Sequence, residues 1–317
     1  MVMSGWLKMK SNKTFINELF SLEELFLRLP SVSHQHAPGS EVYDLMKQIA
    51  RREVEKLFFK QNVEVKEFKP FGNLIFPYYE MGAANSLNLF DFDELIIFSF
   101  YWLNRKRYSR VLDIGANLGL HSIVLSKCGY EVHAYEPDSQ HFEILQKNLE
   151  LNHCSNVRAY NEAVSNRSGI AEFVRVLGNT PSSHIAGSRL NPYGELKRFS
   201  VKVENIESLI NWADLIKLDA EGHEREILLA THREHWLNTD ALVEVGSKDN
   251  AVSIFKHFKA LRIKLFSQKN NWKQVCDIDD VPTSYREGTL FVTSKDRMPW
   301  IRNQNIFPKE RKVNEAF

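Results

Sequence analysis

A carboxylate and two glycines follow a short apolar run near the middle of the chain. Val111-Leu112-Asp113-Ile114 leads into Gly115-Ala116-Asn117-Leu118-Gly119, after which helical spacing begins. In open α/β sheets, ligands bind beyond the carboxyl ends of strands at turns of this kind. The spacing is Gly-x-x-x-Gly, whereas dinucleotide-binding loops carry Gly-x-Gly-x-x-Gly. Because Asp113 would repel a pyrophosphate and attract an ammonium group, the loop favours a cationic amino-acid nucleoside over a nicotinamide dinucleotide.

A second carboxylate, Glu136, ends the next apolar run and is followed by Pro137. A carboxylate at this place accepts hydrogen bonds from both hydroxyls of a ribose, in nicotinamide enzymes as well as in others. Glu136 therefore indicates a nucleoside without identifying it. The structural alternative is that Asp113 and Glu136 are only loop or helix-cap carboxylates.

The elements around these residues alternate between short apolar runs and helical periodicity. This alternation predicts βαβ units and a parallel sheet with right-handed crossovers. The expected strands are 111–114, 131–135, 157–160, 215–218, 242–245, 262–266 and 289–293, and the expected helices include 92–103, 120–127, 139–151 and 254–261, with one more ending at 230. Residues 171–204 look like loops or weak strands.

The first part of the chain has a different pattern. Apolar residues between Phe15 and Leu29 have helical spacing, Ser21 and Glu24 could form a capping box, and a second helix is expected after Ser40. A short hairpin is expected within residues 63–76. We expect this segment to pack on the core, to cap an acceptor pocket or to form a dimer, and the sequence does not choose among these.

Composition excludes several classes of protein. Of 317 residues, 41 are Lys or Arg and 40 are Asp or Glu, so no strongly basic footprint for nucleic acid is present. The three cysteines include no CxxC pair, which argues against a disulfide framework and a cysteine-built zinc site. No secretory signal is apparent, and the most apolar stretch, 95–103, is too short to span a bilayer. A soluble, cytoplasmic protein is expected.

Four segments resemble the FkbM-type methyltransferases. They are Asp113-Ile-Gly-Ala-Asn-Leu-Gly119, Ala134-Tyr-Glu-Pro137, Asn161-Glu-Ala-Val-Ser165 and Ile216-Lys-Leu-Asp-Ala-Glu-Gly-His-Glu224. The resemblance implies the class I S-adenosylmethionine-dependent fold, an α/β, Rossmann-like and mostly parallel sheet of seven strands with an antiparallel last strand. We then expect an N-terminal helical segment with a hairpin (1–85), a methyltransferase domain (86–300) and a C-terminal tail (301–317).

The resemblance also implies a cofactor site for S-adenosylmethionine. Asp113 and the loop backbone would hold the methionine part, with the Asn117 amide near its carboxylate, and Glu136 would hold the ribose. Whether Asn161 or Glu162 reaches the adenine amine stays open. The expected cofactor-binding residues are Asp113, Gly115, Ala116, Asn117, Gly119, Ser122, Glu136, Pro137, Asn161, Glu162, Ala163 and Asp219.

An acidic cluster with a histidine follows the fourth strand, where the transferable methyl group should point. A hydroxyl acceptor loses its proton as the new bond forms, which suits a histidine or a carboxylate. We predict His223 as the base, Asp219 as a second candidate, and Glu221 as a residue that orients the imidazole or binds a substrate hydroxyl. The alternatives are a first helical turn with His223 on the surface and a metal site, although no HExxH motif occurs and no metal is predicted. Residues 180–188 are either a lid or a plain surface loop.

The leading hypothesis is an O-methyltransferase acting on a hydroxyl of a saccharide, such as a surface polysaccharide, a glycolipid or a glycosylated natural product. Its partner would be a saccharide or glycoconjugate, and a homo-oligomer is compatible with the sequence. One alternative is a non-catalytic protein that binds S-adenosylmethionine and docks a partner through its N-terminal helices. The other is a nicotinamide-dependent sugar-modifying enzyme, against which Asp113 and the missing third glycine both count.

Overall fold

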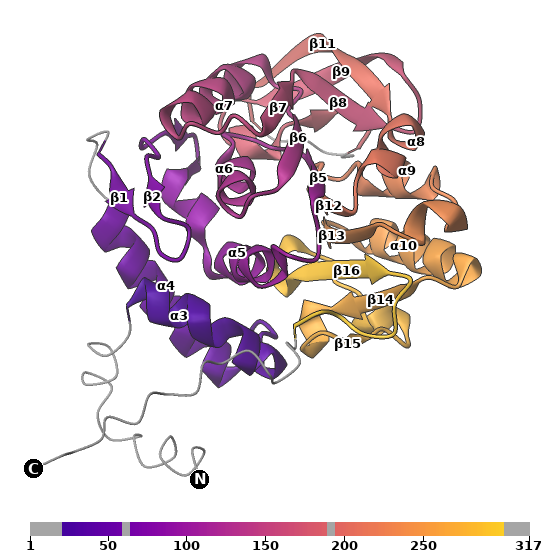
Figure 1. Cartoon of the computed structure of the whole chain (residues 1–317). Coiled ribbons are helices and arrows are strands. Elements are labelled where there is room, and N and C mark those ends of the chain that lie inside the picture. The colour runs from indigo at the N-terminus through magenta and orange to yellow at the C-terminus, as the bar shows by residue number, and fades with distance from the viewer. Residues whose placement is uncertain (1–20, 59–63, 189–193, 301–317) are drawn as a thin grey trace, which may run out of the picture.

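The central element is an eight-stranded sheet. The computed structural model describes residues 21–58, 64–188 and 194–300. The strand order is β15-β14-β16-β13-β12-β5-β6-β7 (Figure 1). The bounds are β5 Arg110–Ile114, β6 Glu131–Tyr135, β7 Val157–Tyr160, β12 Leu215–Leu218, β13 Asp240–Glu244, β14 Lys264–Ser267, β15 Lys273–Gln274 and β16 Thr289–Thr293.

The direction of the strands confirms the predicted architecture. Strands β5, β6, β7, β12 and β13 pair in parallel, and β16 is antiparallel to both β13 and β14. The sheet has eight strands instead of the seven expected because the two-residue strand β15 pairs with β14 at the edge. Seven strands with an antiparallel last strand remain once this short addition is set aside.

Helices cover both faces of the sheet. On one face lie α5 (Phe92–Asn104), α6 (Leu120–Lys127) and α7 (Ser139–Leu151), and on the other lie α8 (Ile206–Leu209), α9 (Glu224–Leu229) and α10 (Lys248–Leu261) (Figure 1). Adjacent residues of β5 point to opposite faces, so Val111 packs with the first group and Leu112 with the second. Both faces of the central strands β5, β12 and β13 are therefore buried, as their apolar runs predict.

A second, four-stranded sheet occupies the segment expected to be loops or weak strands. It consists of β8 (Glu162–Ser165), β9 (Gly169–Val176), β10 (His184–Ile185) and β11 (Leu196–Asn205), in the order β10-β9-β11-β8. Its buried cluster is small, made mainly of Ala163, Phe173, Val201 and Val203. Of the two alternatives for residues 171–204, strands are the one observed. Their pattern is weak because much of β9 and β11 is solvent-exposed, which leaves little hydrophobic alternation in the sequence.

The N-terminal segment contains the expected helices and hairpin. It comprises α3 (Leu22–Arg28), η1 (Leu29–Gln35), α4 (Glu41–Phe58), β1 (Lys66–Glu67) paired with β2 (Asn73–Leu74), β3 (Glu80–Met81) paired with β4 (Ala84–Asn85), and η2 (Ser86–Phe90). The predicted capping box is present, since the N–H of Ser21 donates to Glu24 at 2.9 Å and the N–H of Glu24 donates to Ser21 Oγ at 3.2 Å. The first turns predicted from Phe15 onward lie outside the described residues.

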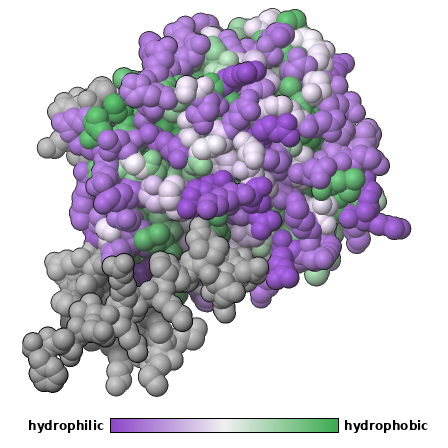
Figure 2. All heavy atoms as spheres, viewed as in Figure 1, coloured by the Kyte–Doolittle hydropathy of each residue, from purple (hydrophilic) through white to green (hydrophobic). Residues whose placement is uncertain are grey.

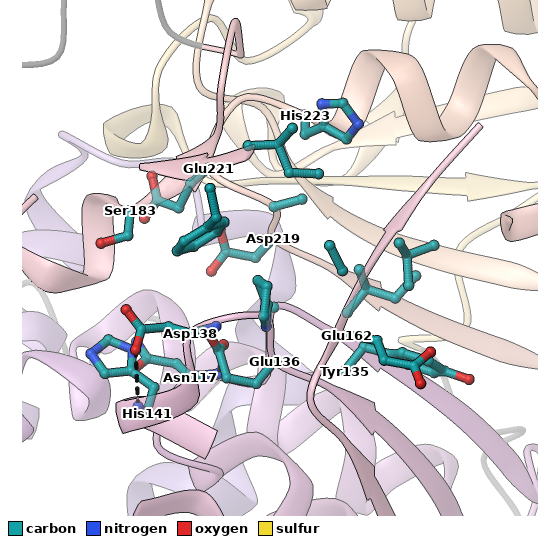
Figure 3. A pocket seen from close by; sticks show the side chains of 18 of the residues that line it. Asn117, Tyr135, Glu136, Asp138, His141, Glu162, Ser183, Asp219, Glu221 and His223 are labelled. Carbon is teal, nitrogen blue, oxygen red and sulfur yellow. Dashed lines mark hydrogen bonds between the residues drawn. The ribbon is translucent and has the colours of Figure 1, made fainter. Parts of the chain in front are cut away.

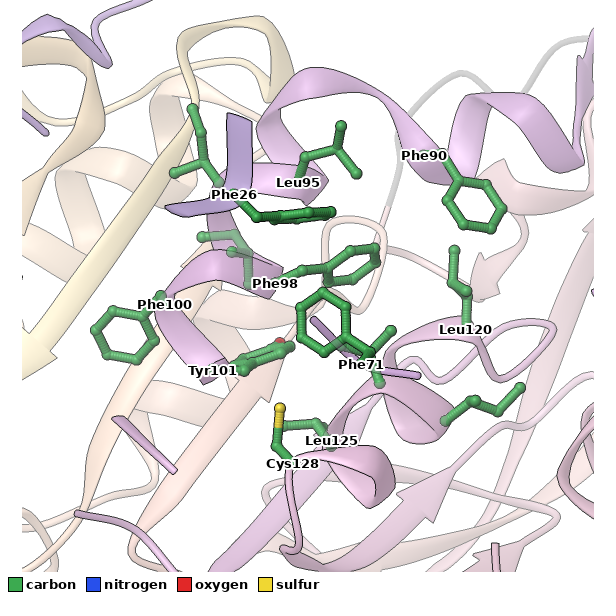
Figure 4. Packing of buried hydrophobic residues seen from close by; sticks show 14 of the residues in the cluster. Phe26, Phe71, Phe90, Leu95, Phe98, Phe100, Tyr101, Leu120, Leu125 and Cys128 are labelled. Carbon is green, nitrogen blue, oxygen red and sulfur yellow. The ribbon is translucent and has the colours of Figure 1, made fainter. Parts of the chain in front are cut away.

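This segment shares one hydrophobic core with the large sheet. Phe26 of α3 contacts Phe71 edge to face, with ring centroids 5.2 Å apart, and Phe71 in turn contacts Phe98 of α5 (Figure 4). The same cluster continues to residues of β5, β6 and β16. Residues 21–58 and 64–85 therefore contribute to the packing of the main domain.

A buried histidine ties the N-terminal segment to the far edge of the sheet. The indole N–H of Trp272 donates to His36 Nδ1 at 2.9 Å, which leaves Nε2–H to donate to the carbonyl of Leu29 at 3.1 Å. One ring nitrogen accepts a hydrogen bond and the other donates one, which is possible only in the neutral imidazole. Burial agrees with this, because it lowers the pKa of His36 to about 3.

The surface is largely polar. Figure 2 shows hydrophilic side chains over most of the visible face, with hydrophobic residues scattered between them. None of the helices within the described ranges combines the length and apolarity that a membrane crossing requires.

Candidate active site

A cavity lies beyond the carboxyl ends of β5, β6 and β12 and beneath the second sheet. Figure 3 shows Asn117, Glu136, Asp138 and His141 on one side of it, and Glu221 and Ser183 opposite. We call it the cofactor cavity. Its lining residues are Ile114, Gly115, Asn117, Tyr135, Glu136, Pro137, Asp138, His141, Glu162, Ala163, Val164, Phe173, Thr180, Pro181, Ser183, Ile185, Asp219, Ala220, Glu221 and His223.

The loop after β5 requires its first glycine. Gly115 has φ +79°, and a Cβ there would lie 1.7 Å from the carbonyl oxygen of Asp219. The N–H groups of Gly115 and Ala116 both donate to the carbonyl of Tyr135, each at 3.0 Å. Gly119 has φ +88° and precedes α6 directly. The loop is thus held against β6 on one side and against the end of β12 on the other.

Glu136 faces the cavity in a fixed orientation. Its Oε2 accepts the N–H of Asn117 at 2.8 Å, and its Oε1 accepts the N–H of Asp138 at 2.8 Å. Burial raises the pKa of Glu136 to about 8, although both backbone donors favour the ionised form. Each oxygen keeps a further lone pair, so the carboxyl group is suited to binding the hydroxyls of a ribose.

Asn117 supplies an unsatisfied polar atom. Its Oδ1 is buried and has no hydrogen-bond partner in the described part of the chain, and the residue lines the cavity. An acceptor left unpaired in this way costs free energy until a ligand donates to it. An ammonium group, such as that of the methionine part of S-adenosylmethionine, would satisfy it.

Asp113 lies beneath the loop and not in the cavity. It is fully buried, its Oδ2 accepts the hydroxyl of Ser122 at 2.6 Å, and neither residue lines the cavity. Strand alternation explains this, because Asp113 points to the same face of β5 as Val111, toward α6. The structure therefore corrects the expectation that Asp113 and Ser122 touch the cofactor: they form the support of the loop.

Lys217 of β12 is a site residue that the sequence reasoning missed. Its Nζ donates to the carbonyl of Gly115 at 3.1 Å and lies 3.5 Å from Asp219 Oδ2 and 3.8 Å from Asp113 Oδ1. Burial alone would lower the pKa of Lys217, but the surrounding carboxylates, Asp219 foremost, raise it. A lysine inside the apolar run 215–218 was the signal that could have revealed it.

The structure separates the two residues considered for the adenine. Asn161 donates to the carbonyl of Glu136 at 2.9 Å and does not line the cavity. Glu162 and Ala163, at the start of β8, do line it. Asn161 therefore stabilises the backbone at Glu136 and does not make the expected contact with the adenine. Glu162 is the acid beside the cavity.

The second sheet is tied to α7 next to this cavity. Asp138 is the N-cap of α7 and forms a buried ion pair with Arg175 of β9. His141 Nε2 lies 2.9 Å from Thr180 Oγ1, and burial lowers the pKa of His141. Thr180, Pro181 and Ser183 line the cavity, so part of the segment 180–188 covers it and is not a plain surface loop.

Asp219, Glu221 and His223 are brought together on the loop after β12. Glu221 has φ +52°, a strained conformation for a non-glycine residue. Glu224 holds this loop, because its Oε1 accepts the N–H groups of Ala220 at 2.9 Å and Gly222 at 3.0 Å. Burial raises the pKa of Glu224 to about 7.

His223 is buried, so the alternative of a surface histidine at the start of a helix is wrong. Its Nε2 lies 2.8 Å from Ser165 Oγ and its Nδ1 lies 2.9 Å from Ser188 Oγ. Two serine hydroxyls therefore orient the imidazole. Burial lowers the pKa of His223, which favours the neutral ring.

A second cavity, of about 760 Å³, adjoins the first at Asn117, Pro181, Asp219 and Glu221, which line both. We call it the acceptor cavity. Its other lining residues are Pro38, Gly39, Tyr43, Asp44, Lys47, Ala84, Asn88, Leu89, Asp91, Asp93, Glu94, Ile97, His121, Lys217, Leu218, Leu242, Glu244, Tyr285, Arg286, Gly288 and Thr289. The N-terminal segment thus packs on the core and also forms part of the wall of this cavity.

Within the described ranges, no group of His, Cys, Asp or Glu side chains is arranged to hold a metal ion.

The strand order, the glycine loop after β5 and the carboxylate that ends β6 define a class I methyltransferase fold. A family model described as "Methyltransferase FkbM domain" matches residues 113–265. Residues 113–265 are therefore similar to the FkbM methyltransferase domain, in agreement with the resemblance of the four sequence segments.

Similar proteins include the methyltransferase sdnD of Sordaria araneosa, which is 26% identical over 159 residues, 40% of this chain and 61% of the relative. This chain therefore spans less than two thirds of that protein. Among solved structures, a precorrin-6y C5,15-methyltransferase from Geobacter metallireducens is 13% identical with a TM-score of 0.33, over 60% of this chain and 82% of the other. A methyltransferase from Agrobacterium tumefaciens is 10% identical with a TM-score of 0.35, over 64% and 62%. Scores this low support no assignment of function.

Proposed function

We propose that this chain transfers a methyl group from S-adenosylmethionine to a hydroxyl group of a saccharide. The observation that carries the proposal is the position of Asp219 and Glu221, which line both cavities. A carboxylate at this junction would face the cofactor from one side and an acceptor from the other. Alignment of two reactants in this way can supply much of the rate of a displacement reaction.

The cofactor would be held mainly by backbone and by acids at strand ends. When bound, S-adenosylmethionine supplies a methyl group on a positively charged sulfur. Gly115 and Asn117 would hold its methionine part, whereas Ala116 and Gly119, also expected to bind it, do not line the cavity and shape the loop instead. Glu136 and Pro137 would hold the ribose, and Glu162 and Ala163 the adenine. The unsatisfied Oδ1 of Asn117 supports this arrangement.

Asp219 is the group best placed to accept the proton of the acceptor hydroxyl. It lines both cavities, and its Oδ2 lies 3.5 Å from the ammonium of Lys217. Glu221 would accept a second hydrogen bond from the acceptor. His223 lines the cofactor cavity alone and is hydrogen-bonded to two serines, so we assign it a positioning role for the loop in place of the role of base.

The polar character of the acceptor cavity supports a hydroxyl-rich acceptor. The carboxyl groups of Asp219 after β12, of Glu244 in β13 and of Asp93 and Glu94 in α5 offer hydrogen-bonding groups on several sides. Tyr43, Asn88 and Tyr285 add further donors and acceptors. Burial and the neighbouring carboxylates raise the pKa of Glu244, so this group is suited to donating a hydrogen bond.

The test is methyl transfer from methyl-labelled S-adenosylmethionine to a panel of saccharides, with Asp219→Asn as the inactive control. Mass spectrometry of glycans from cells with and without the protein would show which glycan loses a methyl group. Cofactor binding with no labelled saccharide would exclude the acceptor class. Failure to bind S-adenosylhomocysteine, with a thermal shift on NAD instead, would exclude the cofactor.

A further inference from the structure

We propose that the acceptor is an extended, uncharged saccharide chain of several units, which runs from the junction of the two cavities along α4 to Arg51. This inference rests on the proposed function and names the acceptor class for the same site. It depends on three observations: a continuous depression, the spacing of the residues that line it, and the pairing of its charges.

The acceptor cavity continues into a groove on α4. The groove is lined by Asp44, Lys47, Gln48, Arg51, Arg52, Glu55 and Asp91, and three of these residues, Asp44, Lys47 and Asp91, also line the acceptor cavity. The acceptor cavity measures about 760 Å³ and the groove about 540 Å³. Pockets of roughly 300–1,000 Å³ hold whole drug-sized molecules, so the two together exceed what a single sugar would fill.

The groove follows one face of the helix. Asp44, Gln48, Arg51 and Glu55 recur at intervals of three or four residues, which places them in a row on α4. At 1.5 Å per residue, this row extends about 16 Å along the helix axis. A linear acceptor lying along it would keep its end at Asp219 and Glu221.

The cations of the groove are neutralised by neighbouring acids. Lys47 Nζ lies 2.7 Å from Asp91 Oδ2, and Arg51 Nε lies 2.6 Å from Glu55 Oε1. Arg52 is paired with Glu53 at 2.8 Å. Such pairs present donors and acceptors side by side without a net positive charge, which suits hydroxyl groups and does not favour a phosphate.

The acceptor cavity itself disfavours anions. Its buried cation, Lys217, is already paired with Asp219, and the carboxylates of Asp44, Asp91 and Glu94 also line the cavity. Arg286, at this cavity, is exposed and stacks on Tyr285. An acceptor with a phosphate, a nucleoside diphosphate or a carboxylate would be repelled on its way to Asp219.

The test is transfer of labelled methyl groups to an array of glycans. The array carries neutral glycans of one to six units and, for each length, a phosphorylated or uronate-bearing counterpart. We expect transfer to neutral glycans of several units, with at least tenfold lower kcat/KM for single sugars and for the anionic counterparts. Equal kcat/KM for single sugars, or preference for anionic glycans, would overturn the inference and leave the proposed function intact. Transfer to no glycan by a chain that binds S-adenosylhomocysteine would reject the saccharide proposal and this inference together.

Two variants test the groove directly. Gln48→Trp fills it from an exposed position, and Arg51→Ala removes one of its ion pairs. Each should lower kcat/KM about tenfold for the longest reactive glycan and leave the shortest reactive glycan unchanged. Lys56→Trp, on the same helix outside the groove, is the matched control. Unaltered length dependence in both groove variants, with unchanged thermal unfolding, would show that the acceptor does not follow α4.

Discussion

The backbone at Gly115 lies so close to Asp219 that a Cβ at position 115 would be 1.7 Å from the carbonyl oxygen of Asp219. These two residues follow β5 and β12, which are neighbours in the sheet. The N–H of Asp219 donates to the carbonyl of Ile114 at 3.0 Å, and Lys217 donates to the carbonyl of Gly115 at 3.1 Å. The loop for the cofactor and the loop of the proposed proton acceptor therefore brace one another.

Gly115→Ala should abolish cofactor binding, because the new Cβ would push the two loops apart. Gly129→Ala is a matched control: Gly129 has φ +89°, but nothing lies within 4 Å of a Cβ there. The control should lose about 1–2 kcal/mol of stability from backbone strain alone and keep its affinity. Calorimetry with S-adenosylhomocysteine measures both. Normal affinity in Gly115→Ala would show that the braced arrangement is not needed.

Glu136→Ala should weaken S-adenosylhomocysteine binding about 10- to 100-fold, because it removes two hydrogen bonds to the ribose of about 0.5–1.5 kcal/mol each. It also releases the N–H groups of Asn117 and Asp138. Glu131→Ala removes an exposed acid from the same strand and should leave binding unchanged. Calorimetric titration of both variants gives the comparison, and equal affinities would remove Glu136 from the site.

Asp219→Asn should lower kcat at least 100-fold, the lower range for loss of a general base, with little change in cofactor affinity. His223→Asn should retain kcat within about tenfold, because a side chain bonded to two serines acts on the position of the loop. Steady-state kinetics with labelled cofactor distinguish the two. If His223→Asn were the inactive variant and Asp219→Asn the active one, the base would be the histidine.

His36 should make stability depend on pH. The unfolded chain binds a proton at this residue below its ordinary pKa of 6.5, whereas the folded chain keeps the ring neutral down to about 3. The free energy of unfolding should therefore fall as the pH decreases through this range, by up to about 1.4 kcal/mol per pH unit. His36→Gln should flatten this slope, and His34→Gln, at an exposed position, should not. Denaturant titrations at several pH values measure it.

The elements with strong periodicity were predictable from sequence. The helices 120–127 and 139–151 and the strands 131–135, 157–160 and 215–218 were expected at the residues where they occur. Strand 215–218 is a largely buried apolar run and helix 139–151 has an apolar stripe packed on the large sheet, so local pattern and tertiary packing agree there.

Features that depend on contacts between distant segments were not predictable. The direction of Asp113 away from the cavity follows from the strand pleat, and the role of Lys217 follows from the pairing of β5 with β12. The second sheet has too little buried surface to leave a clear pattern. The position of α4 beside the acceptor cavity depends on packing of Tyr43 against Phe92 and of Phe58 against Phe90, which no local pattern specifies.

The shared core has a consequence for how such proteins diverge. The family match spans residues 113–265, whereas Tyr43, Lys47, Asp91 and Arg286 of the acceptor cavity lie outside that span. Under the proposed function, part of the surface that would select the acceptor therefore lies outside the stretch that would bind the cofactor. Substitutions on the exposed face of α4 would then change the acceptor specificity during evolution and leave the residues that bind the cofactor unaltered.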